Sequence, residues 1–595
     1  MKKLLYIALT GLLIATVTTS CEDYLEAPAK STLDESVIFS TYDLAKGAVD
    51  GIKVSFAETN SYRGRFLPWY GMNTDVEWNN SSENTDDNYD LVKYNAKPIN
   101  DQMNTTNNAW AKMYEGIERA NICIRGLRAF GNTELDAEMA HLLGEALTLR
   151  AIYYADLVKT WGDVPLRFEP ITTETLYLPK SSRDEIYKQL LMDLEEAATL
   201  VPWPNETANT AIVERVNKAF VKGLRARLAL AAGGYSQYPD GIRLSNDPEL
   251  EREAMYEIAL KESQEVIESG TAHLESSFEQ LWRKFNEDNI NAGGESLWEV
   301  PFSPGRGRWL FTFAIRHNSV DKYTGQPRGG QSGPLPYLFY DYDAKDVRRD
   351  ITCVPYEWKD VRPATDIAEQ EPTGLDTWAF GKFRYEWKNV YVTSSNDDGT
   401  NFMYMRYAEI LMMAAEAALE LGDESSAKSY LKEVRRRAFN EADWTSKVDA
   451  YVDGLSGTAL FDAIVEEHKL EFCGEMQRKQ ALIRWNLLKD KLDEAKDKMY
   501  DLRNKAGDYA DVPETLYYRL ASDNETLEFY GLERGQTEDK SSEYSDSMNW
   551  AVPESLEDNK IESMYDADPN TRQFWPIWQV FVDGSNGQLV NDYGY

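Results

Sequence analysis

The clearest hydrophobic pattern in the chain lies at residues 405–438, where it predicts two short helices. Apolar residues recur at steps of three and four in both halves of this segment, so each half presents one apolar face. Gly422 can adopt the left-handed conformation that ends a helix, and Asp423 can cap the next helix through its carboxylate. Because neither helix can bury its apolar face alone, we expect an antiparallel hairpin within a larger helical assembly.

Further helix pairs are predicted on the N-terminal side of this hairpin. Residues 110–130 and 134–161 form one pair, residues 183–200 and 209–232 form a second pair, and another helix begins at Glu251. The pairs differ in length and connection, so they resemble divergent tetratricopeptide units rather than an exact sequence repeat. The pattern therefore predicts a mainly α fold built from tetratricopeptide-like helical hairpins.

Two segments interrupt the helical pattern. Residues 60–108 are polar and loop-like, and proline, glycine and aromatic residues become frequent at residues 275–400. Residues 296–302 and 382–387 are the clearest short strands. We expect one large domain whose parts are a helical scaffold at about 33–270 and 402–490, loop-rich insertions at about 60–108 and 275–400, and an irregular C-terminal region at 490–595.

Several motifs of the chain resemble the SusD/RagB family. They are R-Y-A-E-I-L starting at Arg406, V-R-R-R-A ending at Ala438, W-G-D-V-P-L starting at Trp161 and F-W-P-I starting at Phe574. Members of this family are outer-membrane lipoproteins that capture nutrients, usually glycans, for a TonB-dependent transporter. The resemblance implies a SusD-like α/α superhelix with a large, irregular, loop-rich ligand-binding face formed by the two insertions.

A later helix follows the family pattern through a ladder of charged residues. Glu467, Glu471, Glu475, Arg478 and Leu482 follow one another at steps of four or three residues, and Arg484 and Trp485 complete the pattern. Residues at such steps lie along one side of a helix and can form Glu–Arg pairs. We interpret this ladder as structural, because such ladders are normally structural or solvated. A catalytic pair of carboxylates is the alternative interpretation.

The charge of the chain excludes some partners. There are 64 Lys and Arg residues against 100 Asp and Glu residues, which gives a net charge of −36. This charge repels phosphate backbones and anionic lipids, so nucleic acid and an electrostatically bound membrane surface are not expected partners. The 16 Trp, 35 Tyr and 21 Phe residues suit neutral ligands such as sugars, although solubility is the simpler explanation of an acidic surface.

Cysteine and histidine usage predicts neither a metal site nor a cofactor. Cys123, Cys353 and Cys473 are far apart in the sequence and form no C-x-x-C motif, so we interpret them as buried free thiols. The chain has only four His residues and no H-E-x-x-H motif, which argues against a zinc enzyme. Asp397-Asp398-Gly399 lacks the spacing of an EF-hand calcium loop.

The first 20 residues predict a lipoprotein signal peptide. Two lysines precede an apolar run that ends at Val17 and is too short to span a bilayer comfortably. Small residues then lead to Cys21, an arrangement that resembles a lipobox, in which the cysteine is acylated and becomes the mature N-terminus. This implies a lipid anchor in the outer membrane, and Glu22 and Asp23 resemble the signal for export to the cell exterior. An ordinary secretory signal is the alternative.

Candidate ligand-binding residues lie in the two insertions. Loops lie at the surface and often carry binding function. A Trp ring can stack on the apolar face of a pyranose, while Asn and Asp side chains bind its hydroxyl groups. The alternative role of these aromatic residues is to anchor the loops onto the helices. The candidates are Trp69, Trp78, Asn79, Asn80, Trp309 and Tyr323.

The resemblance implies a binding protein and not an enzyme. Its expected role is to bind an oligosaccharide or polysaccharide at the cell surface and deliver it to a SusC-like TonB-dependent transporter. A peptide ligand, as in the RagB branch of the family, would rely on backbone pairing along a groove. A glycoside hydrolase would need two carboxylates at a suitable separation across a sugar site. Carboxylates are abundant in the chain, but no motif places such a pair.

Overall fold

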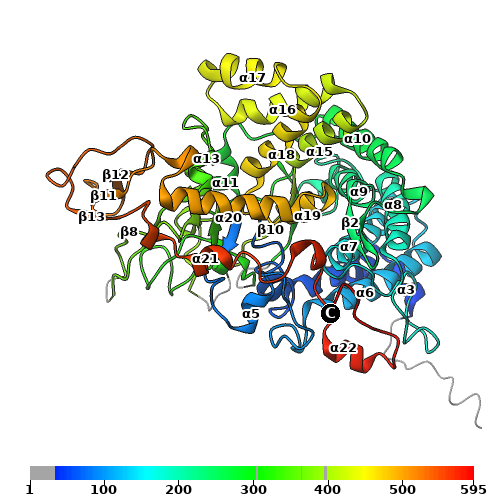
Figure 1. Ribbon diagram of the computed structural model, residues 1–595. Helices are drawn as coiled ribbons and strands as arrows, with labels where there is room; N and C mark the ends of the chain where they lie inside the picture. Colours follow the sequence, from blue (N-terminus) through cyan, green and yellow to red (C-terminus); the bar gives the residue numbers. More distant parts are fainter. Residues whose placement is uncertain (1–33, 303–305, 363–364, 394–397) are drawn as a thin grey trace, which may run out of the picture.

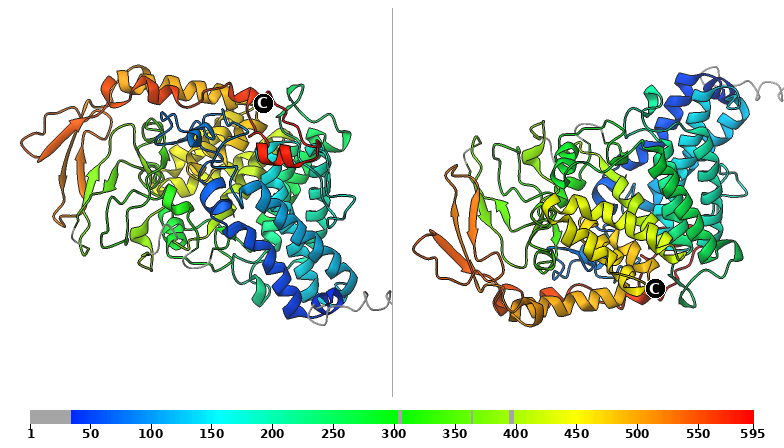
Figure 2. Two further views of the ribbon diagram at one scale, coloured as in Figure 1. Left: turned by 90° about the horizontal axis from the view of Figure 1, so that it is seen from below. Right: turned by 90° about the horizontal axis from the view of Figure 1, so that it is seen from above.

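The computed structural model describes residues 34–302, 306–362, 365–393 and 398–595. In this part of the chain, helices gather on one side of the molecule and loop-rich structure on the other (Figure 1). Helices from residues 109–269 stack at one end, and a small sheet from residues 515–549 projects at the opposite end (Figure 2). The expected signal peptide at residues 1–20 and the expected lipidation site, Cys21, lie outside the described residues.

The helical side consists of hairpins whose members pack side by side along the chain. Its longer helices are α4 (Tyr42–Lys53), α6 (Ala109–Phe130), α7 (Ala137–Trp161), α8 (Arg183–Leu200), α9 (Lys218–Ala232), α10 (Arg252–Ser269), α15 (Tyr407–Glu420), α16 (Glu424–Ala438), α18 (Thr458–Phe472) and α20 (Leu488–Asn504). Contacts run from α6 to α7, α8, α9, α10 and α15 in that order. The predicted mainly α fold with tetratricopeptide-like hairpins is therefore confirmed.

The hairpin predicted at residues 405–438 is present as α15 and α16. Gly422 has a φ of 84°, which is the left-handed conformation expected at the end of a helix. The Asp423 carboxylate accepts a hydrogen bond of 3.0 Å from the backbone N–H of Ser426 and so caps α16. Local sequence signals therefore define this turn correctly.

The remaining helices and strands are short, and they lie on both sides of the molecule. The short helices are α3 (Glu35–Phe39), α5 (Asp87–Asp90), α11 (Phe278–Asn286), α12 (Trp309–Phe313), α13 (Leu338–Asp341), α14 (Arg349–Thr352), α17 (Ala450–Asp453), α19 (Arg478–Arg484), α21 (Asp558–Glu562) and α22 (Gln579–Gly584). The strands are β1 (Glu77–Asn79), β2 (Ser236–Tyr238), β3 (Gly241–Arg243), β4 (Ser296–Val300), β5 (Ser332–Pro334), β6 (Cys353–Val354), β7 (Tyr356–Trp358), β8 (Gln370–Pro372), β9 (Ala379–Phe380), β10 (Phe402–Arg406), β11 (Thr515–Leu520), β12 (Leu527–Tyr530) and β13 (Asp546–Asn549).

All of these strands pair antiparallel. Most form two-stranded sheets, and β12, β11 and β13 form a three-stranded sheet with β11 in the middle. The strand predicted at residues 296–302 is present as β4, which pairs with β10. The strand predicted at residues 382–387 is wrong, because a turn and a short 3₁₀ helix occupy this segment. Lys382 and Phe383 are both buried, so the alternating sequence does not produce alternating exposure.

Two further expectations for the C-terminal part are corrected. The region from residue 490 is not irregular throughout, because it contains most of α20 and the sheet β12-β11-β13. The apolar stripe of α20, from Leu488 to Leu502, repeats at helical steps but is hidden among many charged residues. The charged ladder spans two helices rather than one, because α18 ends at Phe472 and Gly474 turns the chain with a φ of 85°.

A buried network of charges joins the helical side to the loop-rich side. Arg406, at the end of β10, contacts Glu471 of α18 at 2.6 Å and Glu295 at 2.8 Å. Arg348, from the second insertion, contacts Glu471 at 2.8 Å and Glu467 at 2.7 Å. All five side chains are 0% exposed. The predicted pairing of Glu and Arg within one helix is therefore wrong, since the partners come from other elements.

Each carboxylate of this network is balanced by cations. Burial alone would raise the pKa of Glu471, but the guanidinium groups of Arg437, Arg406 and Arg348 hold this pKa well below its ordinary value. Lys382 contributes a further contact of 2.8 Å to Glu475. Removal of one cation would leave a buried carboxylate without full compensation, which is more unfavourable than the absence of the whole network.

The first prediction concerns this network. Replacement of Arg406 by Met should lower the free energy of unfolding by about 3–5 kcal/mol, because Glu295, Glu471 and Glu475 would each lose a buried cationic partner. Chemical denaturation followed by circular dichroism measures this change. The matched control is Arg519→Gln, which removes an exposed ion pair with Glu528 and should change stability by at most about 0.5 kcal/mol. Equal losses in both variants would contradict a special role of the network.

The second prediction concerns Glu77, a fully buried residue of β1. Burial raises the pKa of this carboxyl from 4.5 to about 8, although it accepts a hydrogen bond from the backbone N–H of Gly474. A raised folded-state pKa means that stability present below pH 4.5 is lost as the pH rises through 8. As the pH rises from 5 to 8, the free energy of unfolding of the wild type should therefore fall relative to that of Glu77→Gln by up to about 3 kcal/mol. A constant difference in denaturation experiments across this range would contradict the assignment.

Candidate ligand-binding site

A cleft of about 410 Å³ lies where the first insertion meets the second insertion. Its volume falls within the range of small-molecule sites. We refer to it as the insertion cleft. Its lining residues are Gly64, Arg65, Pro68, Trp69, Asn79, Ser81, Asn88, Tyr89, Gln102, Arg308, Thr312 and Gln331.

Backbone pairing between the two insertions fixes the shape of the insertion cleft. β1 pairs with β5, which places Asn79 opposite Ser332. The ladder continues beyond these strands, because the backbone N–H of Asn80 donates to the Gln331 carbonyl at 2.9 Å. The N–H of Gln331 in turn donates to the Thr312 carbonyl at 3.0 Å. These bonds hold lining residues that are more than 200 positions apart in the sequence.

Two aromatic side chains provide a stacking surface in the insertion cleft. Trp69 follows the short π-helical turn Tyr62–Phe66, and Tyr89 lies in α5. Their ring centroids are 5.9 Å apart with an interplanar angle of 78°, and both rings are partly exposed. Such an edge-to-face pair holds the exposed ring faces in fixed orientations. Tyr89 carries the same sequence signal as Trp69, an aromatic residue within a polar loop, but was not among the predicted site residues.

The remaining lining is rich in amides and hydroxyl groups and contains no carboxylate. Asn79, Asn88, Gln102 and Gln331 supply amide groups that can both donate and accept hydrogen bonds. Asn79 uses its side-chain oxygen to accept a bond of 2.9 Å from the backbone N–H of Ser81. This chemistry matches the hydroxyl groups of a sugar. The two carboxylates that hydrolyse a glycosidic bond are absent from the described lining.

Two of the predicted stacking residues, Trp78 and Trp309, do not line the insertion cleft. Trp78 is 0% exposed, and its ring lies 4.7 Å from the ammonium group of Lys560. Trp309 is 1% exposed and donates from its indole N–H to the Thr400 carbonyl at 3.1 Å. The expectation that either ring stacks on a sugar is therefore wrong. In both cases the neighbouring residue, Asn79 or Arg308, faces the insertion cleft while the tryptophan turns into the core.

The other predicted residues divide between the cleft and its supports. Trp69 and Asn79 line the insertion cleft together. Asn80 instead supports the backbone, since its amide group donates to the carbonyls of Gly330 and Trp378, each at 3.2 Å. Tyr323 packs against Trp358 with ring centroids 5.0 Å apart and does not line the cleft.

Sequence reasoning missed the two arginines of the insertion cleft. Arg65 belongs to the tripeptide R-G-R at residues 63–65, and Arg308 belongs to a second R-G-R at residues 306–308. The repeated tripeptide is a visible signal, because both copies fall in segments predicted to carry the ligand. Only the structure brings the two copies together.

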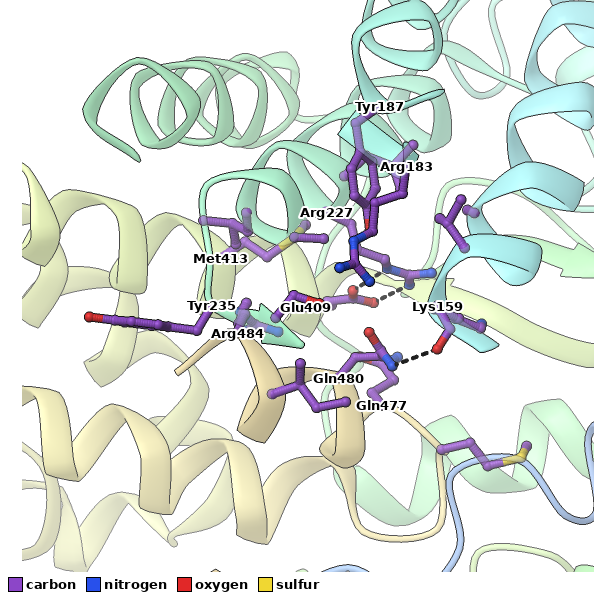
Figure 3. A pocket seen from close by; sticks show the side chains of 18 of the residues that line it. Lys159, Arg183, Tyr187, Arg227, Tyr235, Glu409, Met413, Gln477, Gln480 and Arg484 are labelled. Atoms are coloured by element: carbon purple, nitrogen blue, oxygen red, sulfur yellow. Dashed lines mark hydrogen bonds and ion pairs between the residues drawn. The ribbon is translucent and has the colours of Figure 1, made fainter. Parts of the chain in front are cut away.

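A second cavity lies within the helical side, between α7, α8, α9, α15 and α19 (Figure 3). Its volume is about 100 Å³, which suits a few water molecules rather than a sugar chain. Arg227 and Glu409 face each other across it in a bidentate ion pair with two contacts of 2.6 Å (Figure 3). The charges of this pair are used within the protein, and together with the small volume this favours a structural role.

A third hollow of about 470 Å³ lies beside α10 and α15. Its carboxylates already have partners, since Glu420 pairs with Arg252 at 2.6 Å and Glu416 pairs with Arg484 at 2.7 Å. The insertion cleft differs from this hollow because its aromatic pair and amide groups remain available to a ligand. It is therefore the best candidate site.

Where the structure describes the chain, the arrangement of acidic, histidine and cysteine side chains does not indicate a metal site. The described residues contain no group of three or more His, Cys, Asp or Glu side chains arranged to hold a metal ion. Cys123, Cys353 and Cys473 are free and buried, as predicted. Across the described part of the chain, no helix has the length and apolar character needed to cross a membrane.

Two family models match the chain. The model of the SusD family matches residues 323–595, and a model described as "Starch-binding associating with outer membrane" matches residues 23–230. SusD-like protein P38 of Formosa agariphila is 25% identical over 517 residues, which cover 82% of this chain and 92% of that protein. SusD-like protein P25 of the same organism is 24% identical and covers 79% of this chain and 88% of its own length.

Solved structures share the fold. A SusD homolog from Bacteroides thetaiotaomicron is 18% identical, with a TM-score of 0.72 and coverage of 96% of this chain and 100% of the homolog. Surface glycan-binding protein A from the same species, in complex with laminarihexaose, is 18% identical, with a TM-score of 0.62. The match covers 93% of this chain and 99% of that protein. The two family models, the relatives and the shared fold agree, and the chain belongs to the SusD/RagB family.

Proposed function

We propose that this protein captures a glycan in the insertion cleft and delivers it to a SusC-like TonB-dependent transporter in the outer membrane. The observation that carries the proposal is the lining of the cleft. Trp69 and Tyr89 offer ring faces, amide and hydroxyl groups surround them, and the described lining has no carboxylate. Family membership supports the transporter as the partner.

Binding would combine two kinds of contact. The exposed ring of Trp69 would stack on the apolar C–H face of a sugar, which removes apolar surface from water on both partners. Amide groups such as those of Asn88 and Gln102 would exchange hydrogen bonds with the hydroxyl groups and fix the orientation of the sugar. Because the protein's own backbone ladder between the insertions fixes the positions of lining residues, little ordering is required on binding.

A peptide ligand and glycoside hydrolysis are the alternatives. Hydrolysis lacks support, since the cleft offers neither an acid nor a carboxylate nucleophile among its described lining residues. A peptide would be held mainly through its backbone, and the ring faces would contribute less. The aromatic pair therefore favours a glycan.

We further propose that Cys21 carries the lipid anchor and that the protein faces the cell exterior. The first described helix, α3, packs on α6, so the chain enters the molecule on the helical side. The insertion cleft belongs to the loop-rich side. This arrangement supports a tether and a ligand site on different parts of the molecule.

The third prediction tests glycan capture. Replacement of Trp69 by Ala should weaken glycan binding about tenfold or more, because a buried aromatic contact is commonly worth about 2 kcal/mol. Affinity electrophoresis through gels with single polysaccharides, followed by calorimetry on the retained class, measures this effect. The matched control is Trp444→Ala, a partly exposed tryptophan next to α16, which should bind normally. Retardation equal to that of the wild type would rule out Trp69 as a contact.

Two further readouts separate the alternatives. A protein that binds short peptides but no polysaccharide or oligosaccharide would shift the assignment to peptide capture. Release of reducing ends from a retained polysaccharide would indicate hydrolysis. Trp78→Ala serves as a structural comparison, because truncation of a fully buried Trp should lower the free energy of unfolding by about 3–5 kcal/mol.

The fourth prediction tests the anchor. The wild type should sediment with the outer membrane and incorporate labelled palmitate, whereas Cys21→Ala should do neither, because the acyl chains supply the membrane affinity. Cys123→Ala, which changes a buried thiol of α6, is the control and should behave like the wild type. Palmitate labelling of Cys21→Ala would contradict the proposed site.

A further inference from the structure

The two R-G-R tripeptides place positive charge in the insertion cleft. Arg65 and Arg308 line it, and its described lining has no acidic residue. This is unusual in a chain with a net charge of −36. Elsewhere even surface arginines such as Arg519 and Arg283 have acidic partners. Among the ion pairs and hydrogen bonds of the described residues, none satisfies the guanidinium group of Arg65 or Arg308.

Close packing brings the two tripeptides together. Gly64 lies against the side chain of Arg308, so that a Cβ at this position would be 3.4 Å from the Arg308 Cδ and 2.5 Å from the Thr59 carbonyl. The short distance to the Thr59 carbonyl means that only glycine fits the turn of the first segment at this position, and this turn is in van der Waals contact with the Arg308 side chain. The Arg308 guanidinium lies 5.3 Å from the ring centroid of Phe311, which limits its orientations. The two arginines are therefore held side by side rather than spread over the surface.

The local electrostatics are unfavourable without a partner. Burial lowers the pKa of Arg308, and burial together with the charge of Arg308 lowers the pKa of Arg65. Both guanidinium groups still remain protonated, because arginine does not lose its proton in proteins. Two like charges in a partly buried site without a carboxylate raise the free energy of the empty cleft. An anion bound between them would remove this repulsion.

We infer that the glycan bound in the insertion cleft is anionic, with a carboxylate or a sulfate ester on its sugar units, and that Arg65 and Arg308 bind this group. The inference rests on the proposed function, since it assigns the chemical class of the glycan captured at the same site. A guanidinium group presents planar paired donors that match both anions. Trp69 and Tyr89 hold the ring of the sugar, and the arginines select for its charge.

The fifth prediction uses matched polysaccharides and the mature full-length protein. The probes are polygalacturonate and its carboxyl-reduced form, carrageenan and its desulfated form, and the neutral glucan laminarin. The wild type should bind at least one anionic probe about tenfold or more tightly than its uncharged counterpart, because hydrogen bonds to charged groups contribute most of the selectivity. This preference should decrease with added salt. The retained member of each pair identifies the carboxylate or the sulfate ester as the recognised group.

Variants assign the selectivity to the two arginines. Arg65→Gln and Arg308→Gln should each weaken binding of the anionic probe about tenfold and reduce the preference of the protein for this probe over its uncharged counterpart. Arg65→Lys should retain part of the preference, because it keeps the charge but loses the paired donors. Arg519→Gln removes the same charge from an exposed site in β11 and should bind as the wild type does. Unfolding midpoints of all variants verify that each is folded.

The outcomes separate this inference from the proposed function. Equal binding of charged and uncharged probes, or full selectivity in both Gln variants, would overturn the anionic ligand. If Trp69→Ala still lost binding of a neutral glycan in that case, glycan capture in the cleft would stand. If no probe or oligosaccharide bound in a Trp69-dependent manner, both proposals would fail together.

Discussion

The structure depends on a set of buried guanidinium–carboxylate contacts at the junction of its two sides. Arg406 and Arg348 both reach Glu471 of α18, although one arginine comes from the strand before the central hairpin and the other from the second insertion. Charges this deeply buried are tolerated only when every partner is present. The network therefore ties the second insertion and the strand before the central hairpin to the same residue of α18.

Support for the insertion cleft extends outward from this junction. The tryptophans that were expected to contact ligand, Trp78 and Trp309, instead fill the core beneath it. Their neighbours Asn79 and Arg308 are thereby presented to the cleft. The β1–β5 ladder then connects the two insertions through backbone hydrogen bonds. Contacts within the protein thus fix the shape of the cleft, and such an arrangement reduces the conformational entropy lost when a ligand binds.

The fold and the lining of the insertion cleft are determined by different parts of the chain. The helical hairpins are shared with SusD-type structures at identities near 18%, which shows that this architecture tolerates extensive sequence change. The residues of the insertion cleft come from loops, where side chains can vary without disturbing the scaffold. Acidic residues that balance arginines elsewhere are absent from the described lining of the cleft. Its positive charge is thus a local property within a strongly acidic protein.

The sequence by itself determined the helical hairpins, their caps and the segments that carry the site. These features depend on neighbours within a few positions, as in the capping of α16 by Asp423. Only the tertiary structure decided which side chains within those segments face the insertion cleft. Trp69 and Trp78 are alike in the sequence, yet one is partly exposed and the other is fully buried. The difference arises from contacts between residues hundreds of positions apart, which local periodicity does not encode, and the same long-range packing brings Arg65 beside Arg308.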